Sequence, residues 1–203
     1  MSFLPSLPEN THLIKDVWPT FPKGVSELLA FIDVVMHGES ELTIPEREII
    51  FAYVSALQDC KFCFNAHACF AEEYGATREA VDGLWDLDNP PASDKMKPVL
   101  AYTRKISEAP HTVTKADVDA LLAAGWTEQG VADIVYSIGV SNMMTRVVAG
   151  FGVQSQQQYF DALRERHRRV AIEDRRAKEA QAQGQPKYVN FVKLDPLTAS
   201  NAA

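Results

Sequence analysis

The sequence predicts an all-α fold, and three observations lead to this prediction. Apolar residues recur at intervals of three and four along most of the chain, which is the spacing of one helix face. Threonines and glycines stand at the expected starts and ends of these periodic segments, where they cap helices. Alternating apolar and polar runs bounded by hairpin turns, which would indicate strands, are scarce. We therefore expect a bundle of about eight or nine helices.

The two ends of the chain differ from its periodic middle. Most of the early prolines fall in residues 1–23, which we expect to form an extended N-terminal arm. Residues 24–153 are expected to be the helical core. Residues 154–203 should form a polar helix continuing outward over 156–184 and then a loose arm that docks on a neighbouring subunit. The expected core helices cover 25–38, 43–58, 60–75, 77–87, 95–110, 114–125 and the mostly apolar, buried 127–153.

Capping signals justify two neighbouring core helices. Thr43 stands three residues before Glu46, which is the spacing of a capping box. Asp59 is placed to cap the following helix with its carboxylate, and Gly75 is placed to end that helix.

The composition is that of a soluble globular protein with an acidic balance. The chain has 203 residues, of which 46% are hydrophobic and 23% charged, and its net charge is -7. This charge argues against nucleic acid or an anionic membrane as the main partner. No apolar run approaches the ~20 residues that span a bilayer, and the first residues lack the basic and apolar regions of a signal peptide. We therefore expect a cytoplasmic protein, in which thiols are held reduced.

The cysteine pattern is the strongest functional signal. Cys60, Cys63 and His67 fall at i, i+3 and i+7, which puts all three on one face of a helix. Cys60 would lie near the positive end of the helix dipole, which favours a thiolate. His67 lies one turn beyond Cys63 and could act as its base. A carboxylate that orients this histidine is expected from the preceding helix, where Glu48 is the better candidate because Glu46 is engaged in the cap.

These residues resemble a known signature. Glu48, Cys60, Cys63 and His67, at these offsets, resemble the motif of the alkylhydroperoxidase D family, within the carboxymuconolactone decarboxylase superfamily. The resemblance extends from about residue 25 to about residue 153 and includes an asparagine-arginine region in the second half, with Asn142 and Arg146. It implies a helical bundle that forms homo-oligomers (dimer, trimer or hexamer) and reduces hydroperoxides through thiols.

The resemblance also implies a role for each residue. Cys63 would be attacked by the hydroperoxide to form a sulfenic acid, and Cys60 would resolve it into a Cys60–Cys63 disulfide. His67 and Glu48 would form the proton relay, and a dithiol or protein reductant, which the sequence does not identify, would reopen the disulfide. The helix dipole favours Cys60 as the more acidic thiol. We nevertheless assign the reaction with the hydroperoxide to Cys63, because the neighbouring base His67 can also accept the thiol proton. No metal, haem or flavin is implied, and no glycine-rich loop for a nucleotide is present.

Several other interpretations of the same residues remain open. The first is a lyase or isomerase of the carboxymuconolactone decarboxylase type, without cysteine redox chemistry. The second is a redox sensor or binding protein that uses the disulfide as a switch. Two further alternatives are a zinc-stabilised bundle, with Cys60, Cys63, His67 and Glu48 as ligands, and a pair of buried structural thiols.

The remaining candidate residues are interpreted as structural. Cys69 is turned away from the cysteine face and is expected in the core. His12 and His37, in the arm and at a helix end, are expected to face solvent. Asn142 and Arg146 lie in a helix that looks buried, so we expect the arginine to make an internal salt bridge or a subunit contact. A candidate partner for that salt bridge is Asp133, on the same helix. The arginines after residue 163 alternate with acidic residues and are expected on a solvated helix.

Overall fold

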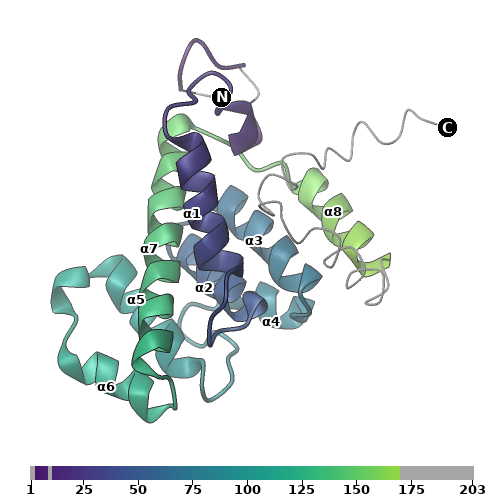
Figure 1. The fold of residues 1–203 in the computed structure, drawn as a ribbon. Helices are drawn as coiled ribbons and strands as arrows, with labels where there is room; N and C mark the ends of the chain where they lie inside the picture. Colours follow the sequence, from purple (N-terminus) through teal and green to yellow (C-terminus); the bar gives the residue numbers. More distant parts are fainter. Residues whose placement is uncertain (1–2, 9–10, 170–203) are drawn as a thin grey trace.

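A computed structural model of the chain describes residues 3–8 and 11–169 (Figure 1). Within these residues the fold is all-α, with no strand, which confirms the predicted fold class. The α-helices are α1 Val25–His37, α2 Ile44–Leu57, α3 Lys61–Glu73, α4 Arg78–Asp82, α5 Lys97–Glu108, α6 Lys115–Ala123, α7 Glu128–Phe151 and α8 Gln157–Arg169. Three single turns of 3-10 helix, at Ile14–Asp16, Gly83–Trp85 and Pro110–Thr112, connect them.

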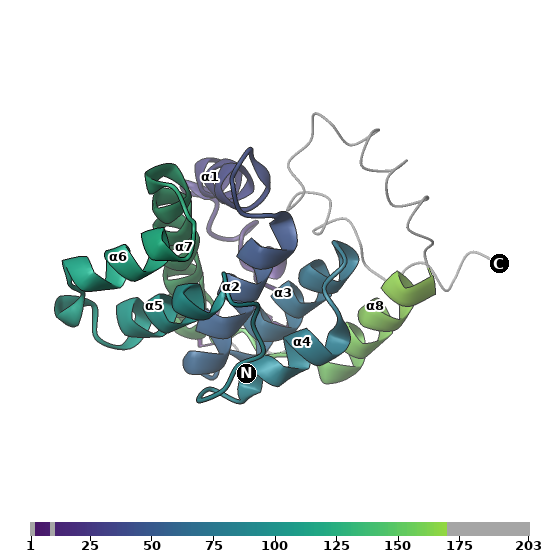
Figure 2. The ribbon, with the colours of Figure 1, turned by 90° about the horizontal axis from the view of Figure 1, so that it is seen from below.

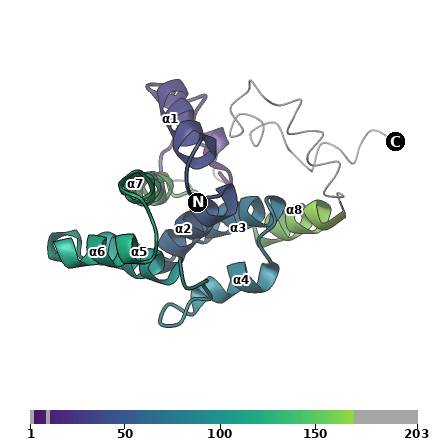
Figure 3. The ribbon, with the colours of Figure 1, turned by 60° about the horizontal axis from the view of Figure 1, so that its bottom comes forward.

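Helices α2 and α3 form the centre of the molecule. They pack against each other, while α5 and α6 lie on the α2 side and α8 lies beyond α3 (Figures 2 and 3). Helix α2 begins with the predicted capping box: the Thr43 backbone N–H donates to Glu46 Oε2 at 2.8 Å, and the Thr43 hydroxyl accepts from the Glu46 backbone. Nearly every later side chain of α2 is buried, so this helix brings its polar residues into the interior.

The corner between α2 and α3 differs from the prediction. Asp59 does not cap α3: its backbone lies in the left-handed region at φ 49° and its side chain is exposed. Cys60 is the N-cap residue instead, and its N–H donates to the Ser55 carbonyl at 2.9 Å. Cys63 therefore lies within the first turn of α3. Gly75 follows the end of the helix with φ 103°, as expected for a residue that terminates a helix.

The N-terminal segment is part of the core, and the prediction of an extended arm there is wrong. Leu7, Ile14 and Val17 are buried in the same hydrophobic cluster as Cys63. Phe3 packs on Gly152, which has φ 70°, and a side chain at Gly152 would meet the Phe3 ring at 2.8 Å. The segment therefore closes one end of the bundle.

The C-terminal helix turns back rather than continuing outward as predicted. Gly152 ends α7, and α8 then packs along α3 (Figure 1), with Phe160 and Leu163 fully buried. The remainder of the helix predicted over 156–184 and the docking arm lie outside the described residues.

Helix α7 is long and apolar enough to cross a membrane by length and composition alone. It packs against α1, α2, α5 and α6, and Ile134 and Ile138 are fully buried, which is the pattern of a core helix.

Candidate thiol site

Cys60 and Cys63 are joined in a disulfide at the start of α3. Their Cα atoms lie 5.4 Å apart, which is within the usual range for disulfides. Cys60 is partly exposed at the N-cap, whereas Cys63 is buried. One sulfur of the pair is thus accessible from the surface and the other belongs to the interior.

His67 and Glu48 meet directly behind the buried cysteine. The Nδ1 atom of His67 lies 2.6 Å from Oε2 of Glu48, and both side chains are buried. The His67 ring stacks on Phe51, so its plane is held between the two helices. Because Nδ1 faces the carboxylate, Nε2 is the nitrogen through which His67 would exchange a proton with a reacting group. The structure therefore brings together all four residues of the predicted site.

Glu48 is a carboxylate inside the core. Burial by itself would raise the pKa of Glu48, but the charge of His67 and the hydrogen bonds of His37 and His67 outweigh burial and hold this pKa below its ordinary value. A charged Glu48 fixes the orientation of His67.

His37 is the residue that the sequence analysis missed. The prediction that it faces solvent is wrong, because its side chain is only 5% exposed and its Nε2 atom lies 3.5 Å from Oε1 of Glu48. Its Nδ1 atom lies 3.0 Å from Oδ1 of Asp33, one turn earlier on α1. The four-residue spacing of Asp33 and His37 was the signal available, since an acid and a base at i and i+4 share a helix face.

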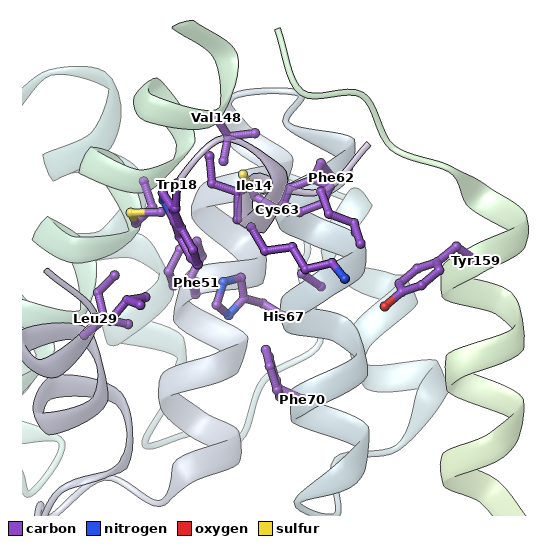
Figure 4. A pocket seen from close by; sticks show the side chains of 15 residues that line it. Ile14, Trp18, Leu29, Phe51, Phe62, Cys63, His67, Phe70, Val148 and Tyr159 are labelled. Atoms are coloured by element: carbon purple, nitrogen blue, oxygen red, sulfur yellow. The ribbon is translucent and has the colours of Figure 1, made fainter. Parts of the chain in front are cut away.

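An apolar cavity of about 50 Å³ lies next to Cys63 and His67 (Figure 4). Its walls come from the N-terminal segment and from α1, α2, α3, α7 and α8. Among the side chains that line it are Ile14, Trp18, Leu29, Phe51, Phe62, Met144, Val148 and Tyr159. An apolar lining of this kind favours an apolar reactant and strengthens electrostatic interactions around the sulfur, because surroundings of low polarity screen charges weakly.

The other predicted residues have structural positions. Cys69 is a free thiol buried in the core, as predicted, and burial raises its pKa. The prediction that Arg146 is buried is wrong, since it is exposed and donates to the Asn142 carbonyl at 2.7 Å rather than to Asp133. The alternative of a subunit contact stays a prediction. The Asn142 amide oxygen accepts from Gln58 at 2.6 Å, which ties α7 to the corner before Cys60.

In the part of the chain that the structure describes, no three His, Cys, Asp or Glu side chains are grouped so that they could hold a metal ion. The cysteine sulfurs are bonded to each other and Glu48 faces histidines.

Comparisons with known proteins show similarity at the level of structure. No protein-family model matches the chain, and no curated protein matches it either. A peroxidase-related protein from Silicibacter sp. TM1040, itself uncharacterized, is 22% identical with a TM-score of 0.67, over 72% of this chain and 78% of that one. An uncharacterized peroxidase-related protein from Ralstonia eutropha JMP134, with an alkylhydroperoxidase AhpD core, is 23% identical with a TM-score of 0.66, over 71% and 76%. A protein of unknown function from Agrobacterium tumefaciens, described as an AhpD-type candidate for antioxidant defence, is 17% identical with a TM-score of 0.63, over 72% and 98%.

The fold and the site together define an all-α protein with a cysteine pair beside a buried histidine–carboxylate couple. Its fold is that of AhpD-like, peroxidase-related proteins. The resemblance predicted from the cysteine signature is thereby confirmed at the level of the fold.

Proposed function

We propose that this protein reduces organic hydroperoxides through the Cys60–Cys63 pair. The observation that carries the proposal is the position of the buried Cys63 sulfur. It lies at an apolar cavity that also holds His67, and His67 is bound by a buried carboxylate. Activated thiols need a base within reach and a third group that orients this base. The AhpD-like fold supports the same activity.

The chemistry starts from the reduced pair. The Cys63 thiolate attacks the outer oxygen of the hydroperoxide, the O–O bond breaks, and the alkoxide leaves with a proton from His67 as an alcohol. Cys63 is now a sulfenic acid. The Cys60 thiol attacks the Cys63 sulfur, and hydroxide leaves with the thiol proton as water. Two thiols and one hydroperoxide thus give a disulfide, an alcohol and water.

The two cysteines suit different steps. Cys63 is buried next to the base and the cavity, which fits the peroxide-reacting role. Cys60 is partly exposed at the N-cap of α3, where an external dithiol or protein reductant could reach it and reopen the disulfide. The reductant must keep the pair reduced, which fits the cytoplasm.

The proposal includes self-association, which the sequence resemblance implies. Exposed apolar side chains on the outer faces of the neighbouring helices α1 and α7 support it, among them Phe31, Val34, Val135 and Met143. Light scattering on the purified chain would measure the size of the assembly.

The first test is the fate of the three thiols under peroxide. Reduced protein is treated with one equivalent of cumene hydroperoxide, denatured and alkylated, and its intact mass is measured by mass spectrometry. We expect the wild type to lose two alkylatable thiols and to yield a Cys60–Cys63 peptide pair. Cys63→Ser should lose none, and the matched control Cys69→Ala should behave like the wild type, because Cys69 does not line the cavity.

Other outcomes of this test discriminate between the interpretations. If the cysteine pair is oxidised by the peroxide but no dithiol supports repeated turnover, a redox switch is favoured. If all three thiols remain alkylatable in the wild type under excess peroxide, the oxidoreductase proposal fails. A decarboxylase-type lyase or isomerase, or a metal centre, then becomes the next hypothesis.

A further inference from the structure

We propose that His37 is a positioning residue for the thiol site, acting through Glu48 to keep that carboxylate charged while His67 gives its proton away. Asp33 connects this second histidine to the surface. The inference rests on the proposed peroxide chemistry and assigns it a histidine from α1, outside the cysteine motif.

The four side chains form a line across the bundle. His67 Nδ1 contacts Glu48 Oε2 at 2.6 Å, Glu48 Oε1 faces His37 Nε2 at 3.5 Å, and His37 Nδ1 contacts Asp33 Oδ1 at 3.0 Å. The exposed fractions of these side chains are 6%, 0%, 5% and 27% in the same order. The line therefore runs from the cavity through a buried centre, and Asp33 is its most exposed member.

A charged Glu48 with no exposure needs a positive partner at every stage of the reaction. In the resting site a protonated His67 supplies it. When the leaving alkoxide takes the proton of His67, this partner becomes neutral. His37 lies between two carboxylates and can then carry the compensating proton, which it exchanges with solvent beside Asp33. No net proton crosses the protein in this scheme, so the balance of the overall reaction is unchanged.

A purely structural role for His37 is less well supported. Arg47 already connects α2 to the end of α1, because its Nη1 donates hydrogen bonds to the carbonyls of Val35 and Gly38 at 2.9 and 3.0 Å. A neutral apolar residue at position 37 would leave these bonds in place. Glu48 is already paired with His67. A second imidazole, that of His37, facing the same carboxylate is explained if it compensates the charge of Glu48 when His67 becomes neutral.

The charged and titratable groups around His37 come from three elements. Asp33 faces it from α1, Glu48 and Arg47 come from α2, and the Tyr74 ring at the end of α3 lies 6.1 Å from its ring. Two carboxylates and one guanidinium thus surround His37. Removing His37 leaves His67 and Arg47 as the positive groups that act on Glu48.

The test is the single-turnover oxidation of reduced Cys63 by cumene hydroperoxide, from about pH 5 to about pH 9, a range that brackets ordinary histidine and cysteine titration. His37→Leu should lower the maximal rate about tenfold, as expected when the partner that orients a reacting group is lost. The alkaline limb of its pH–rate profile should move up by about one pH unit, because the charge of Glu48 then acts on His67 without the competing charge of His37.

Two further variants separate charge from packing. His37→Gln keeps a hydrogen-bond donor for Glu48 but cannot be charged, so it should recover part of the rate and still show the displaced alkaline limb. His111→Gln, at an exposed histidine in the turn after α5, is the matched control and should leave rate and profile unchanged.

The results distinguish this inference from the function on which it rests. A wild type that does not react with the peroxide refutes the proposed function. If the wild type reacts and folded His37→Leu shows the same rate and the same profile, the role of His37 is refuted. Should His37→Leu fail to fold by circular dichroism, His37→Gln decides by the position of its alkaline limb.

Discussion

Glu48 and Glu72 are carboxylates that have similar surroundings but different kinds of partner; Glu48 is fully buried and Glu72 is partly buried. Each has two basic neighbours, one close and one more distant. Glu48 faces His67 at 2.6 Å and His37 at 3.5 Å. Glu72 faces Arg164 at 2.9 Å and Arg78 at 3.3 Å. An arginine stays charged at every accessible pH, whereas a histidine can lose its charge.

This difference separates a structural ion pair from a reactive one. Arg164 also binds Asp82 at 2.8 Å, so the cluster around Glu72 joins α8, α3 and α4. Its charges cannot be moved by proton transfer. The histidines of Glu48 can release and regain protons, and one of them, His67, lines the cavity beside Cys63. We infer that the Glu72 cluster holds the fold together and that the Glu48 cluster serves the chemistry.

The largest expected effect is on the rate of Cys63 oxidation. Glu48→Gln should slow it roughly 100-fold, because an uncharged amide neither orients His67 nor stabilises its protonated form, and general acid–base groups contribute on this scale. The measurement is single-turnover oxidation by cumene hydroperoxide at neutral pH. Glu72→Gln is the matched control and should keep the wild-type rate. An equal loss of the Cys63 oxidation rate in Glu48→Gln and Glu72→Gln would contradict the assignment of a chemical role to the Glu48 cluster and a structural role to the Glu72 cluster.

The next effect is on stability and its pH dependence. Glu72→Gln should lower the free energy of unfolding by roughly 2–3 kcal/mol at neutral pH. It leaves Arg164 with Asp82 alone, and breaking a buried ion pair is costly. Urea unfolding followed by circular dichroism measures this change.

The pH dependence has a definite sign. Burial would raise the pKa of Glu72, but Arg164 and then Arg78 outweigh burial and lower it below the ordinary value of 4.5. A carboxylate whose pKa is lowered in the folded state contributes stability above its unfolded pKa and loses it as pH falls. The stability difference between wild type and Glu72→Gln should therefore shrink once the pH drops below about 4.5. A difference that stays constant down to the acid-unfolding range would show that the charge of Glu72 is not the source of its effect.

The sequence was informative where one element decides the geometry, and less so where several elements meet. The capping box of α2 and the phase of Cys60, Cys63 and His67 on α3 depend on spacing within a helix, so they were predicted. Glu48 was predicted because a lone carboxylate at the head of a buried stretch must find a partner.

The errors arose from contacts between distant segments. The prediction that Arg164 lies on a solvated helix is wrong, because Arg164 is buried and pairs with Glu72 of α3 and Asp82 of α4. The spacing of Asp33 and His37 marks a shared face of α1, but it does not reveal that Glu48 of α2 lies against that face. The early prolines correctly excluded a long helix, but they carried no information about whether the segment packs. That packing depends on Leu7, Ile14 and Val17 meeting the cysteine helix.

The smallest expected effect concerns the outer arginine of the structural cluster. Arg78 is 30% exposed and lies farther from Glu72 than Arg164 does, so solvent screens its charge. Arg78→Gln should lower the free energy of unfolding by less than about 1 kcal/mol and leave the rate and pH profile of Cys63 oxidation unchanged. The comparison with His37→Gln is direct, since both variants replace the more distant basic neighbour of a buried carboxylate with the same amide. If Arg78→Gln also displaces the pH–rate profile, the displacement in His37→Gln reflects a general loosening of α3 rather than the charge on Glu48.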